Sequence, residues 1–437
     1  MKISSLQEKI LKKANKFLKF GKFTELELSR NGYFYFCPFA PTKGNAKLLS
    51  FIYKLSSFKV YLYATLTDCI KIFRFSGFET LQPQKLKNYK FIVVNWGTYT
   101  SFNKRGEYFD KHLNVSSQYC KNVLWYIIYL DKKIPKKISN NIVIVNEIKK
   151  FSFFNLISIF KKLLSGKIRL NIINQEISNF SLLSNYVYQN FDKYIVNAKK
   201  VLIPYEGQPF QNAIFKKVSE IKPKIMTVGF VHSFPIGLPS NFIKRSGHPQ
   251  KLILNSLSQK YSFLKYLGWS KNELKVLPSS RFKKKIKEDM GNKIYLPIKF
   301  YNYKSITSSL IYLINYLKMD LSKLEIKNHP SCLKSKKHIK LVKLIDQTIK
   351  ENKHRKKIEK NMSIFIGATG SVIEALERDY NIFHITEKPV LECYTKKIWK
   401  YIDATHIGNN LFNYKKIKNN KLIIFNNNKK IYRKYIF

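Results

Sequence analysis

The stretch KKVLIPYEGQPFQNAIFKKVSEI (residues 199–221) holds the local pattern that decides the fold. Its apolar run KVLIPY (200–205) is rich in residues that favour a β-strand, whereas QNAIFKKVSEI (211–221) has apolar residues at helical spacing. Between the two, Gly207 permits a tight turn, and Pro209 is of a type favoured in the first turn of a helix. The stretch therefore predicts a strand that leads directly into a helix, the repeating unit of parallel α/β sheets.

The same alternation of short apolar runs and helical stretches extends along the chain. Further strands are predicted in the first half at 58–64, 90–96, 122–130, 141–146 and 222–233, and in the second half at 251–256, 274–280, 293–298, 324–330, 362–368 and 380–385. We therefore expect an α/β protein with two Rossmann-like, doubly wound domains that face a cleft. In such sheets, ligands bind outside the carboxyl ends of the strands.

A segment dense in Pro, Gly and Ser, PIGLPSNFIKRSGHP (235–249), marks the expected boundary between the domains. The predicted division is an N-terminal domain at 1–240, a C-terminal domain at 241–410, and an Asn- and Lys-rich tail at 411–437. We expect the tail either to pack back on the N-terminal domain or to fray.

The composition is strongly basic, because 80 of the 437 residues are Lys or Arg and only 27 are Asp or Glu, for a formal net charge of +53. This charge raises the alternative of a nucleic-acid-binding protein. However, only nine of the basic residues are Arg, whose fork suits phosphate and base recognition, and the Lys residues are spread along the whole chain. We therefore expect no specific nucleic-acid partner, and a surface that could rest on an anionic membrane or hold a phosphorylated substrate.

Cysteine usage and hydropathy bear on the cellular compartment. The five Cys stand at long spacings without a CxxC pair, which fits a reducing cytosol and argues against a disulfide framework or a zinc site. The first residues lack the continuous apolar core of a signal peptide, and no apolar run approaches the roughly 20 residues of a membrane span. We expect a cytoplasmic protein, with peripheral contact at the inner face of the membrane as an open alternative.

A glycine-rich turn in the second half, GATGSVIEAL (367–376), follows one predicted strand and opens a helix. Such a turn offers backbone N–H groups and hydroxyls to an anion, so Gly367, Thr369, Gly370 and Ser371 are candidates for holding a phosphate, with Glu374 on a ribose hydroxyl. The alternative is structural, because Ser371 and Glu374 have the spacing of a capping box.

Two other strand ends in the second half carry candidate donor-binding residues. In IKNHPSC (326–332), His329 and Lys327 could contact a nucleotide phosphate, with Pro330 holding the backbone extended; a surface histidine in a loop is the structural alternative. In LPSSRFK (277–283), the candidates for binding a diphosphate or an acidic sugar are Ser279, Ser280 and Arg281, and a plain turn is the alternative.

Glu206 is the candidate catalytic base of the first half. Its carboxylate follows a predicted strand, at the edge where the domains are expected to face each other, and it could accept a proton from an acceptor hydroxyl. A carboxylate near a helix N-terminus is also mildly stabilising, which is the structural alternative.

The order and spacing of YEG (205–207), LGWSKNELKVLPSSRF (267–282), KNHP (327–330) and GATGSVIEAL (367–376) resemble bacterial GT-B glycosyltransferases of surface-polysaccharide assembly. This group includes polysialyltransferases, capsular Kdo transferases and CDP-glycerol glycerophosphotransferases. The resemblance covers roughly residues 200–410. It departs from the sialyltransferases in having one carboxylate in the acidic motif and about 200 residues before it.

The resemblance implies a metal-independent glycosyltransferase of capsule or lipopolysaccharide biosynthesis, with an N-terminal acceptor domain and a C-terminal nucleotide-sugar donor domain. It implies no cofactor other than the co-substrate, a CMP-linked acidic sugar, and a glycan or lipid-linked glycan acceptor. Glu206 would be the base, and His329, Thr369 and Ser371 would contact the donor phosphate. Open alternatives on the same fold are a CDP-glycerol-type phosphotransferase, a UDP-sugar epimerase and a scaffold that binds glycan without catalysis.

Overall fold

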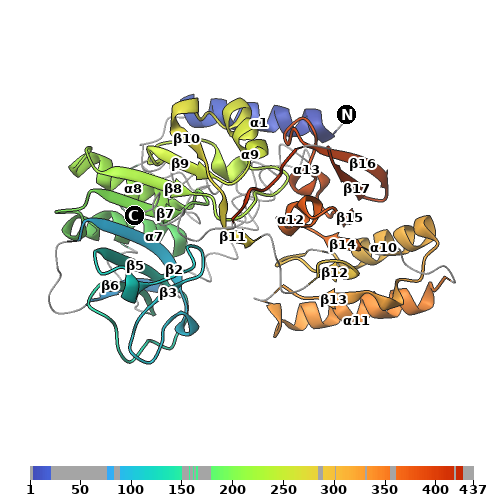
Figure 1. Cartoon of the computed structure of the whole chain (residues 1–437), viewed down its shortest axis with the longest axis horizontal. Helices are drawn as coiled ribbons and strands as arrows, with labels where there is room; N and C mark the ends of the chain where they lie inside the picture. The colour runs from blue at the N-terminus through green and yellow to red at the C-terminus, as the bar shows by residue number, and fades with distance from the viewer. Residues whose placement is uncertain are drawn as a thin grey trace.

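The structure is a computed structural model of the chain. It describes residues 3–20, 76–82, 89–149, 179–283, 289–300, 302–329, 332–354, 361–417 and 420–426, with a few positions between 157 and 165. Within these residues the chain forms two large, mostly parallel sheets, which confirms the predicted α/β class (Figure 1). The predicted strand at 58–64 lies outside the described residues.

The first sheet has eight strands in the order β1-β6-β5-β2-β7-β8-β9-β10. Only β1 is antiparallel to its neighbour, and the other pairs are parallel. Their bounds are β1 (Ser76–Leu81), β2 (Phe91–Gly97), β5 (Val123–Tyr129), β6 (Ile142–Lys149), β7 (Lys200–Pro204), β8 (Met226–Phe230), β9 (Lys251–Leu254) and β10 (Leu274–Val276). The parallel strands therefore run outward in both directions from a switch point between β2 and β7, as in the Rossmann arrangement.

Both faces of this sheet are covered, so its central strands carry apolar residues on both faces. In β2, Ile92 and Val94 belong to one buried cluster, whereas Val93 belongs to the cluster on the opposite face. Helices α7 (Asn179–Asn190) and α8 (Pro209–Ile221) pack on each other, and α9 (Leu257–Tyr266) follows β9. The strand–turn–helix unit predicted around Gly207 is confirmed as β7 followed by α8, which starts at Pro209 as expected.

The second sheet has six strands in the order β13-β12-β14-β15-β17-β16. Their bounds are β12 (Lys293–Tyr295), β13 (Glu325–Lys327), β14 (Met362–Ile366), β15 (Asn381–Ile385), β16 (Ile402–Gly408) and β17 (Leu411–Lys416). The first four are parallel, and β17 and β16 add an antiparallel edge. The switch point lies between β12 and β14. Helices α10 (Tyr303–Leu317) and α11 (Lys336–Glu351) pack together, and α12 (Ser371–Glu377) and α13 (Pro389–Glu392) follow β14 and β15.

One part of the predicted organisation was wrong. The strands expected at 251–256 and 274–280 were assigned to the second half, but β9 and β10 extend the first sheet beyond β8. The first sheet thus continues past residue 240, and the change of sheet falls between β10 and β12. The reason is that strand pairing is decided by packing between distant segments, which the local composition of a Pro- and Gly-rich segment does not reveal.

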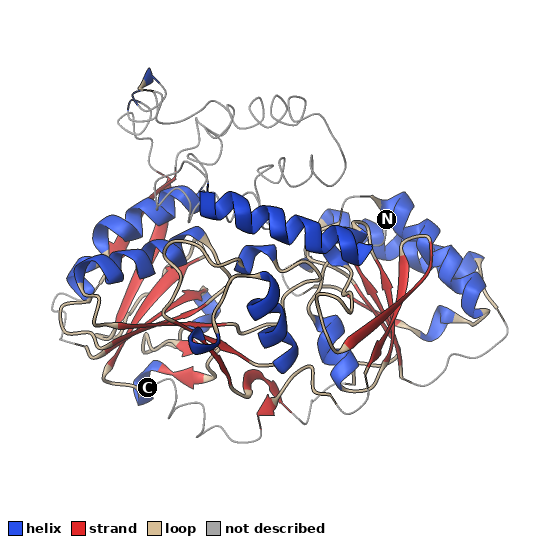
Figure 2. Cartoon of the chain, turned by 90° about the horizontal axis from the view of Figure 1, so that it is seen from above, coloured by secondary structure: helices blue, strands red, loops and turns tan. Residues whose placement is uncertain are grey.

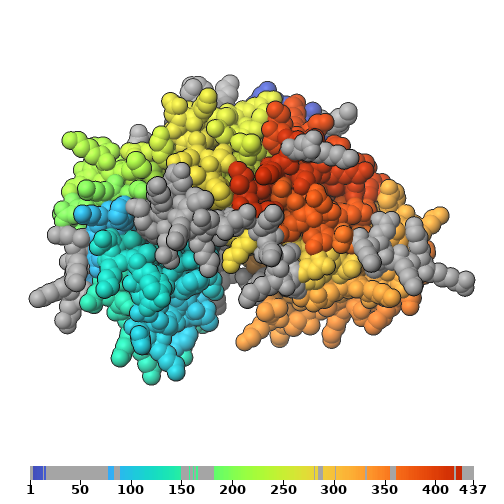
Figure 3. Space-filling view, viewed as in Figure 1, coloured from blue at the N-terminus to red at the C-terminus, as the bar shows by residue number. Residues whose placement is uncertain are grey.

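The two halves are joined by both ends of the described chain. Residues 411–416 of the predicted tail form β17 of the second sheet, whereas β18 (Phe425–Asn426) pairs with β11 (Ser279–Lys283). Just before β18, the Ile424 N–H donates to the Asn255 carbonyl at the end of β9, at 2.9 Å. In space-filling view the molecule shows two lobes with an indentation between their lower parts (Figure 3).

Helix α1 (Ile3–Phe20) lies across the two halves, as the long helix beside the N label in Figure 2. Its buried face repeats at helical spacing through Gln7, Ile10, Leu11 and Ala14. The Gln7 side-chain amide donates to the carbonyls of Val390 and Cys393 in the second half, at 3.0 and 2.8 Å. Further along the helix, the Asn15 amide donates to the Tyr266 carbonyl of α9 in the first half, at 2.6 Å. The helix therefore has partners in both halves.

Candidate active site

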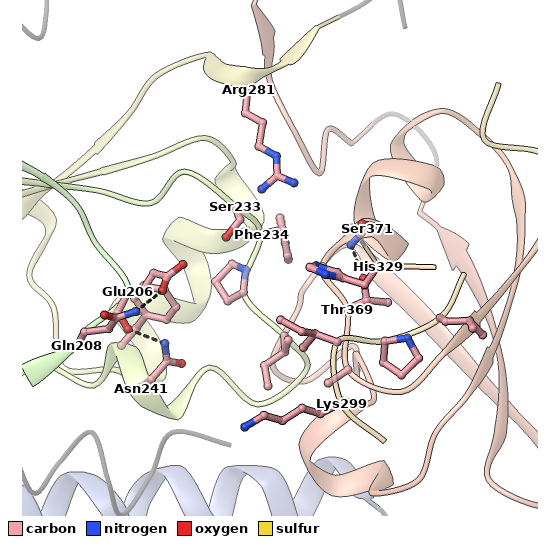
Figure 4. Close-up of a pocket in the computed structure, with 18 of the residues that line it drawn as sticks. Glu206, Gln208, Ser233, Phe234, Asn241, Arg281, Lys299, His329, Thr369 and Ser371 are labelled. Carbon is pink, nitrogen blue, oxygen red and sulfur yellow. Dashed lines mark hydrogen bonds between the residues drawn. The ribbon is translucent and has the colours of Figure 1, made fainter. Parts of the chain in front are cut away.

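A cavity of about 440 Å³ lies between the two halves (Figure 4). Its walls come from segments that follow β7 and β8 in the first sheet and β12, β13 and β14 in the second. The cavity therefore lies beside strands that border both switch points, where open α/β sheets bind ligands. Its lining residues are Glu206, Gln208, Ser233, Phe234, Pro235, Ile236, Asn241, Phe242, Arg281, Phe282, Leu296, Pro297, Ile298, Lys299, His329, Ala368, Thr369, Gly370 and Ser371.

The turn that carries Glu206 is held in one conformation by side chains. Gly207 has a φ of +70°, and a Cβ at this position would lie 2.2 Å from the Asn241 carbonyl oxygen, so the turn requires glycine. The Gln211 side chain accepts from the N–H groups of Glu206 and Gln208, at 2.9 and 3.0 Å. Its amide also donates to the Pro204 carbonyl at 2.7 Å, which ties the turn to the end of β7.

A second set of contacts holds the same turn from the loop after β8. The Asn241 amide donates to the Glu206 carbonyl at 2.8 Å. The buried Arg245 guanidinium donates to the carbonyls of Gly207, Asn241 and Ile243. The backbone of the turn is thus anchored on both sides, which leaves the Glu206 side chain directed toward the cavity (Figure 4).

The Glu206 carboxylate is enclosed but reachable, since its side chain is 36% exposed. One oxygen accepts from the Gln208 amide at 2.8 Å, and the other lies 3.4 Å from His232 Nε2. Burial raises the pKa of this carboxyl, and the Gln208 hydrogen bond and the Arg281 charge oppose that rise. A carboxylate with a raised pKa is a better general base than an ordinary one.

Sequence reasoning missed a buried polar network beside Glu206. The rings of His232 and His112 lie 4.2 Å apart. His112 Nδ1 is 3.1 Å from the Asn95 side-chain oxygen, and the Asn95 amide donates to Asp110 at 2.6 Å. Burial raises the pKa of Asp110 to about 6, against the hydrogen bonds that it accepts. The available signal was a polar residue at or just after a strand end, because Asn95 lies near the end of β2 and His232 follows β8.

The opposite side of the cavity is basic. Arg281 extends from β11 into the space between the halves, and Lys299, which follows β12, points toward the first half (Figure 4). His329 follows β13, and its pKa is lowered by burial and by the charges of Arg281 and His338. Arg281 and His329 were both predicted as donor-binding residues, and the structure brings them to one cavity.

The loop after β14 supplies hydroxyl groups to the same cavity through Thr369 and Ser371. A Cβ on Gly370 would lie 2.4 Å from the Phe234 carbonyl oxygen, so glycine permits the two halves to approach closely here. The Tyr394 hydroxyl bridges the contact by donating to the carbonyls of Pro235 and Thr369, at 2.9 and 3.1 Å.

Four other predicted site residues do not line this cavity. Ser279 is fully buried, and its hydroxyl accepts from the N–H groups of Arg281 and Phe282, at 3.2 and 3.1 Å. Lys327 forms an ion pair with Glu325 at 2.5 Å. The other two are Gly367 and Glu374.

Gly367 turns the chain at the end of β14, with a φ of +63°. Glu374 pairs with Arg378 at 2.8 Å on the same helix. Because α12 starts at Ser371, the residue before the helix is Gly370, and the capping box considered for Ser371 and Glu374 does not form. Pro330 and the side chain of Ser280 lie outside the described residues.

Among the described residues, no group of three or more His, Cys, Asp or Glu side chains is placed to hold a metal ion. No helix among them is long and apolar enough to cross a membrane.

The two mostly parallel sheets with a cavity between them form the GT-B arrangement expected from the sequence. No family model matches the chain, and no curated protein matches it. Among solved structures, the chain is similar to a glycosyltransferase from Rickettsia africae ESF-5, with 9% identity and a TM-score of 0.32 over 68% of this chain and 84% of that chain. This likeness is distant.

Proposed function

We propose that this chain is a metal-independent glycosyltransferase that moves a sugar from a nucleotide donor to a hydroxyl of a surface glycan or lipid-linked glycan. One observation carries the proposal: a single cavity between two switch points has a carboxylate with a raised pKa on one side and basic and hydroxyl groups on the other. A transfer that takes a proton from one substrate and develops negative charge on the other needs this pairing.

The donor would bind on the side of the second sheet. The charges of Arg281 and Lys299 would attract its phosphate. His329, Thr369 and Ser371 would donate hydrogen bonds to it. The same basic side chains would suit a carboxylated sugar, which agrees with the CMP-linked acidic sugar that the sequence resemblance implies. The acceptor would enter from the side of the first sheet, next to Glu206.

In the proposed reaction, Glu206 accepts the proton of the acceptor hydroxyl while that oxygen bonds to the anomeric carbon of the donor sugar. The bond between the anomeric carbon and the donor phosphate oxygen breaks, and its electron pair leaves with the nucleotide. Arg281, Lys299 and His329 would stabilise the negative charge that develops on the phosphate. Closure of the two halves would exclude water and limit hydrolysis of the donor.

The proposal is tested by thermal-shift titration of the purified chain with CMP, CDP, UMP, UDP and GDP, since a ligand of the native state raises its melting temperature. Selective stabilisation by CMP is the expected result, and transfer is then assayed with CMP-linked acidic sugars. Stabilisation by CDP would favour a glycerophosphate-type transferase. A preference for UDP or GDP would contradict the proposed donor class, with an epimerase as one alternative for UDP. Stabilisation by DNA or RNA alone would refute the glycosyltransferase proposal.

A further inference from the structure

His232 lies outside the cavity lining and approaches the Glu206 carboxylate. It follows β8, the strand next to β7, so neighbouring strands of one sheet present the two residues at the same edge. We propose that His232 is a positioning residue, which holds the Glu206 carboxylate by donating the proton on Nε2. This inference rests on the proposed function, in which Glu206 is the base.

The two oxygens of the carboxylate have different partners. The Gln208 amide donates to one oxygen at 2.8 Å, and His232 Nε2 lies 3.4 Å from the other. This second distance is slightly beyond the usual range of an N–H···O hydrogen bond, so a small movement of either side chain would complete the bond. An ionised carboxylate only accepts hydrogen bonds, so it favours the imidazole tautomer that carries its proton on Nε2. Both oxygens would then face a neutral donor, which fixes the orientation of the carboxylate.

The ring of His232 is itself held by packing. Its side chain is only 7% exposed. The ring lies 4.2 Å from the ring of His112, 6.2 Å from that of Trp96 and 6.3 Å from that of Phe230. Its Nδ1 is buried and has no hydrogen-bond partner among the described residues, so Nε2 is the only ring nitrogen that engages a polar partner there.

The charged and titratable groups around this pair come from several elements. His112 faces the His232 ring, Arg281 of β11 acts on both His232 and Glu206, and Lys299 and His329 line the same cavity. The Arg245 guanidinium donates to the Gly207 carbonyl, in the turn that carries Glu206. Burial, His112 and Arg281 all lower the pKa of His232, so its imidazole is neutral.

A neutral partner has a chemical consequence. An arginine or lysine in the place of His232 would lower the pKa of Glu206 and make it a weaker base. A neutral imidazole orients the carboxylate while leaving most of its basicity, which is what a general base needs near neutral pH. His232 thus orients the base, whereas the residues that would stabilise the charge on the donor phosphate lie on the other side of the cavity.

The test compares His232→Phe, which keeps an aromatic ring but loses the donor, with His232→Gln, which keeps a neutral N–H donor. We expect His232→Phe to lower kcat roughly tenfold to a hundredfold with little change in donor KM, because the base is no longer oriented. Loss of a donor to the ionised form raises the pKa of Glu206, so the acid limb of the pH–rate profile should move up by about one pH unit. His232→Gln should restore most of kcat and return the acid limb of the pH–rate profile close to its wild-type position.

His248→Phe is the matched control. His248 also packs edge-on against a tryptophan, Trp269, at 5.5 Å, and it does not line the cavity. This variant should leave the pH–rate profile in place. An unchanged profile in His232→Phe, or a His232→Gln variant no better than His232→Phe, would overturn the proposal. If His232→Phe does not fold, His232→Leu takes its place with the same expectation.

A measurement that needs no activity separates this inference from the proposed function. Infrared difference spectroscopy, with Glu206→Gln as the reference that identifies the band, follows protonation of the Glu206 carboxyl in the folded protein. The midpoint of this carboxyl titration should rise by about one pH unit in His232→Phe and return close to the wild-type value in His232→Gln. If the wild-type chain transfers no sugar, the proposed function fails, whereas the titration still decides whether His232 holds the Glu206 carboxylate.

Discussion

Two turns face each other across the cavity, and they are built differently. The turn after β7 and the turn after β14 both contain a glycine with positive φ, Gly207 at +70° and Gly367 at +63°. In the first turn, the side chains of Gln211, Asn241 and Arg245 hold the backbone on both sides. In the second turn, the side chains of His384 and Tyr394 also contact backbone carbonyls, those of Gly367 and Thr369, at 2.7 and 3.1 Å. The difference lies in the side chains that face the cavity. The Ser371 hydroxyl has no hydrogen-bond partner among the described residues, and the Thr369 hydroxyl accepts only the Ser371 N–H, at 3.2 Å.

This difference matches the roles proposed for the two turns. A group that must meet a reacting hydroxyl at a fixed distance benefits from a rigid support, because small displacements of a catalytic group are costly. Hydroxyls that bind a ligand benefit from remaining available, because a group already paired must lose one hydrogen bond to make another. The comparison predicts that changes in the first turn affect chemistry and folding, whereas changes in the second affect ligand affinity.

The largest effect is expected for Glu206→Gln, which keeps the size of the side chain and removes the base. Transfer should fall by about 10²- to 10⁴-fold. Nucleotide affinity and melting temperature should stay near wild-type values, because the substitution removes no contact to the donor side and its amide oxygen can still accept from Gln208. Steady-state kinetics beside a nucleotide titration checks this, and near-normal transfer would remove Glu206 from the mechanism.

The two glycines provide a direct comparison of rigidity. Gly207→Ala introduces a Cβ that would lie 2.2 Å from a backbone oxygen at positive φ, so it should lower the free energy of unfolding by at least about 2 kcal/mol. In Gly367→Ala the nearest neighbour of the new Cβ is the Pro297 side chain, at 3.1 Å, and the substitution should cost about 1 kcal/mol. Gly268→Ala is the control for positive φ alone, since its nearest neighbour is 3.4 Å away. Urea unfolding curves measure all three, and equal losses at Gly207 and Gly268 would contradict the comparison.

Arg281→Ala should weaken nucleotide binding about tenfold, because a charged donor to the phosphate is lost from an exposed position. The remaining affinity should depend less on salt than that of the wild type. Calorimetric titration at low and moderate ionic strength checks both points. Unchanged affinity at both salt concentrations would exclude Arg281 from the donor site.

The smallest effect is expected for Ser371→Ala, which should weaken nucleotide binding by a few-fold, corresponding to about 0.5–1.5 kcal/mol for a neutral hydrogen bond. Stability should not fall, because this hydroxyl makes no hydrogen bond within the described part of the chain. The same titration measures the effect, with the thermal midpoint as the control. A marked loss of stability instead would show that the Ser371 hydroxyl helps to hold the second turn.

Local signals explain which features the sequence could predict. The strand, the turn at Gly207 and the helix from Pro209 are adjacent in the chain, so spacing alone reveals them. The glycine and hydroxyl residues after β14 were found in the same way. The assignment of β9 and β10 failed because the choice of neighbouring strand depends on packing between distant segments. His232 was missed because its meeting with Glu206 arises only once β8 pairs with β7, more than twenty residues apart.

Helix α1 has a consequence for the order in which the chain folds during synthesis. The Gln7 amide bonds to the Cys393 carbonyl, across a sequence separation of 386 residues. The buried face around Gln7 therefore lacks this partner until residues near 393 have been made. The Tyr266 carbonyl that binds Asn15 is made much earlier, so the two ends of the helix meet their partners at different stages of synthesis.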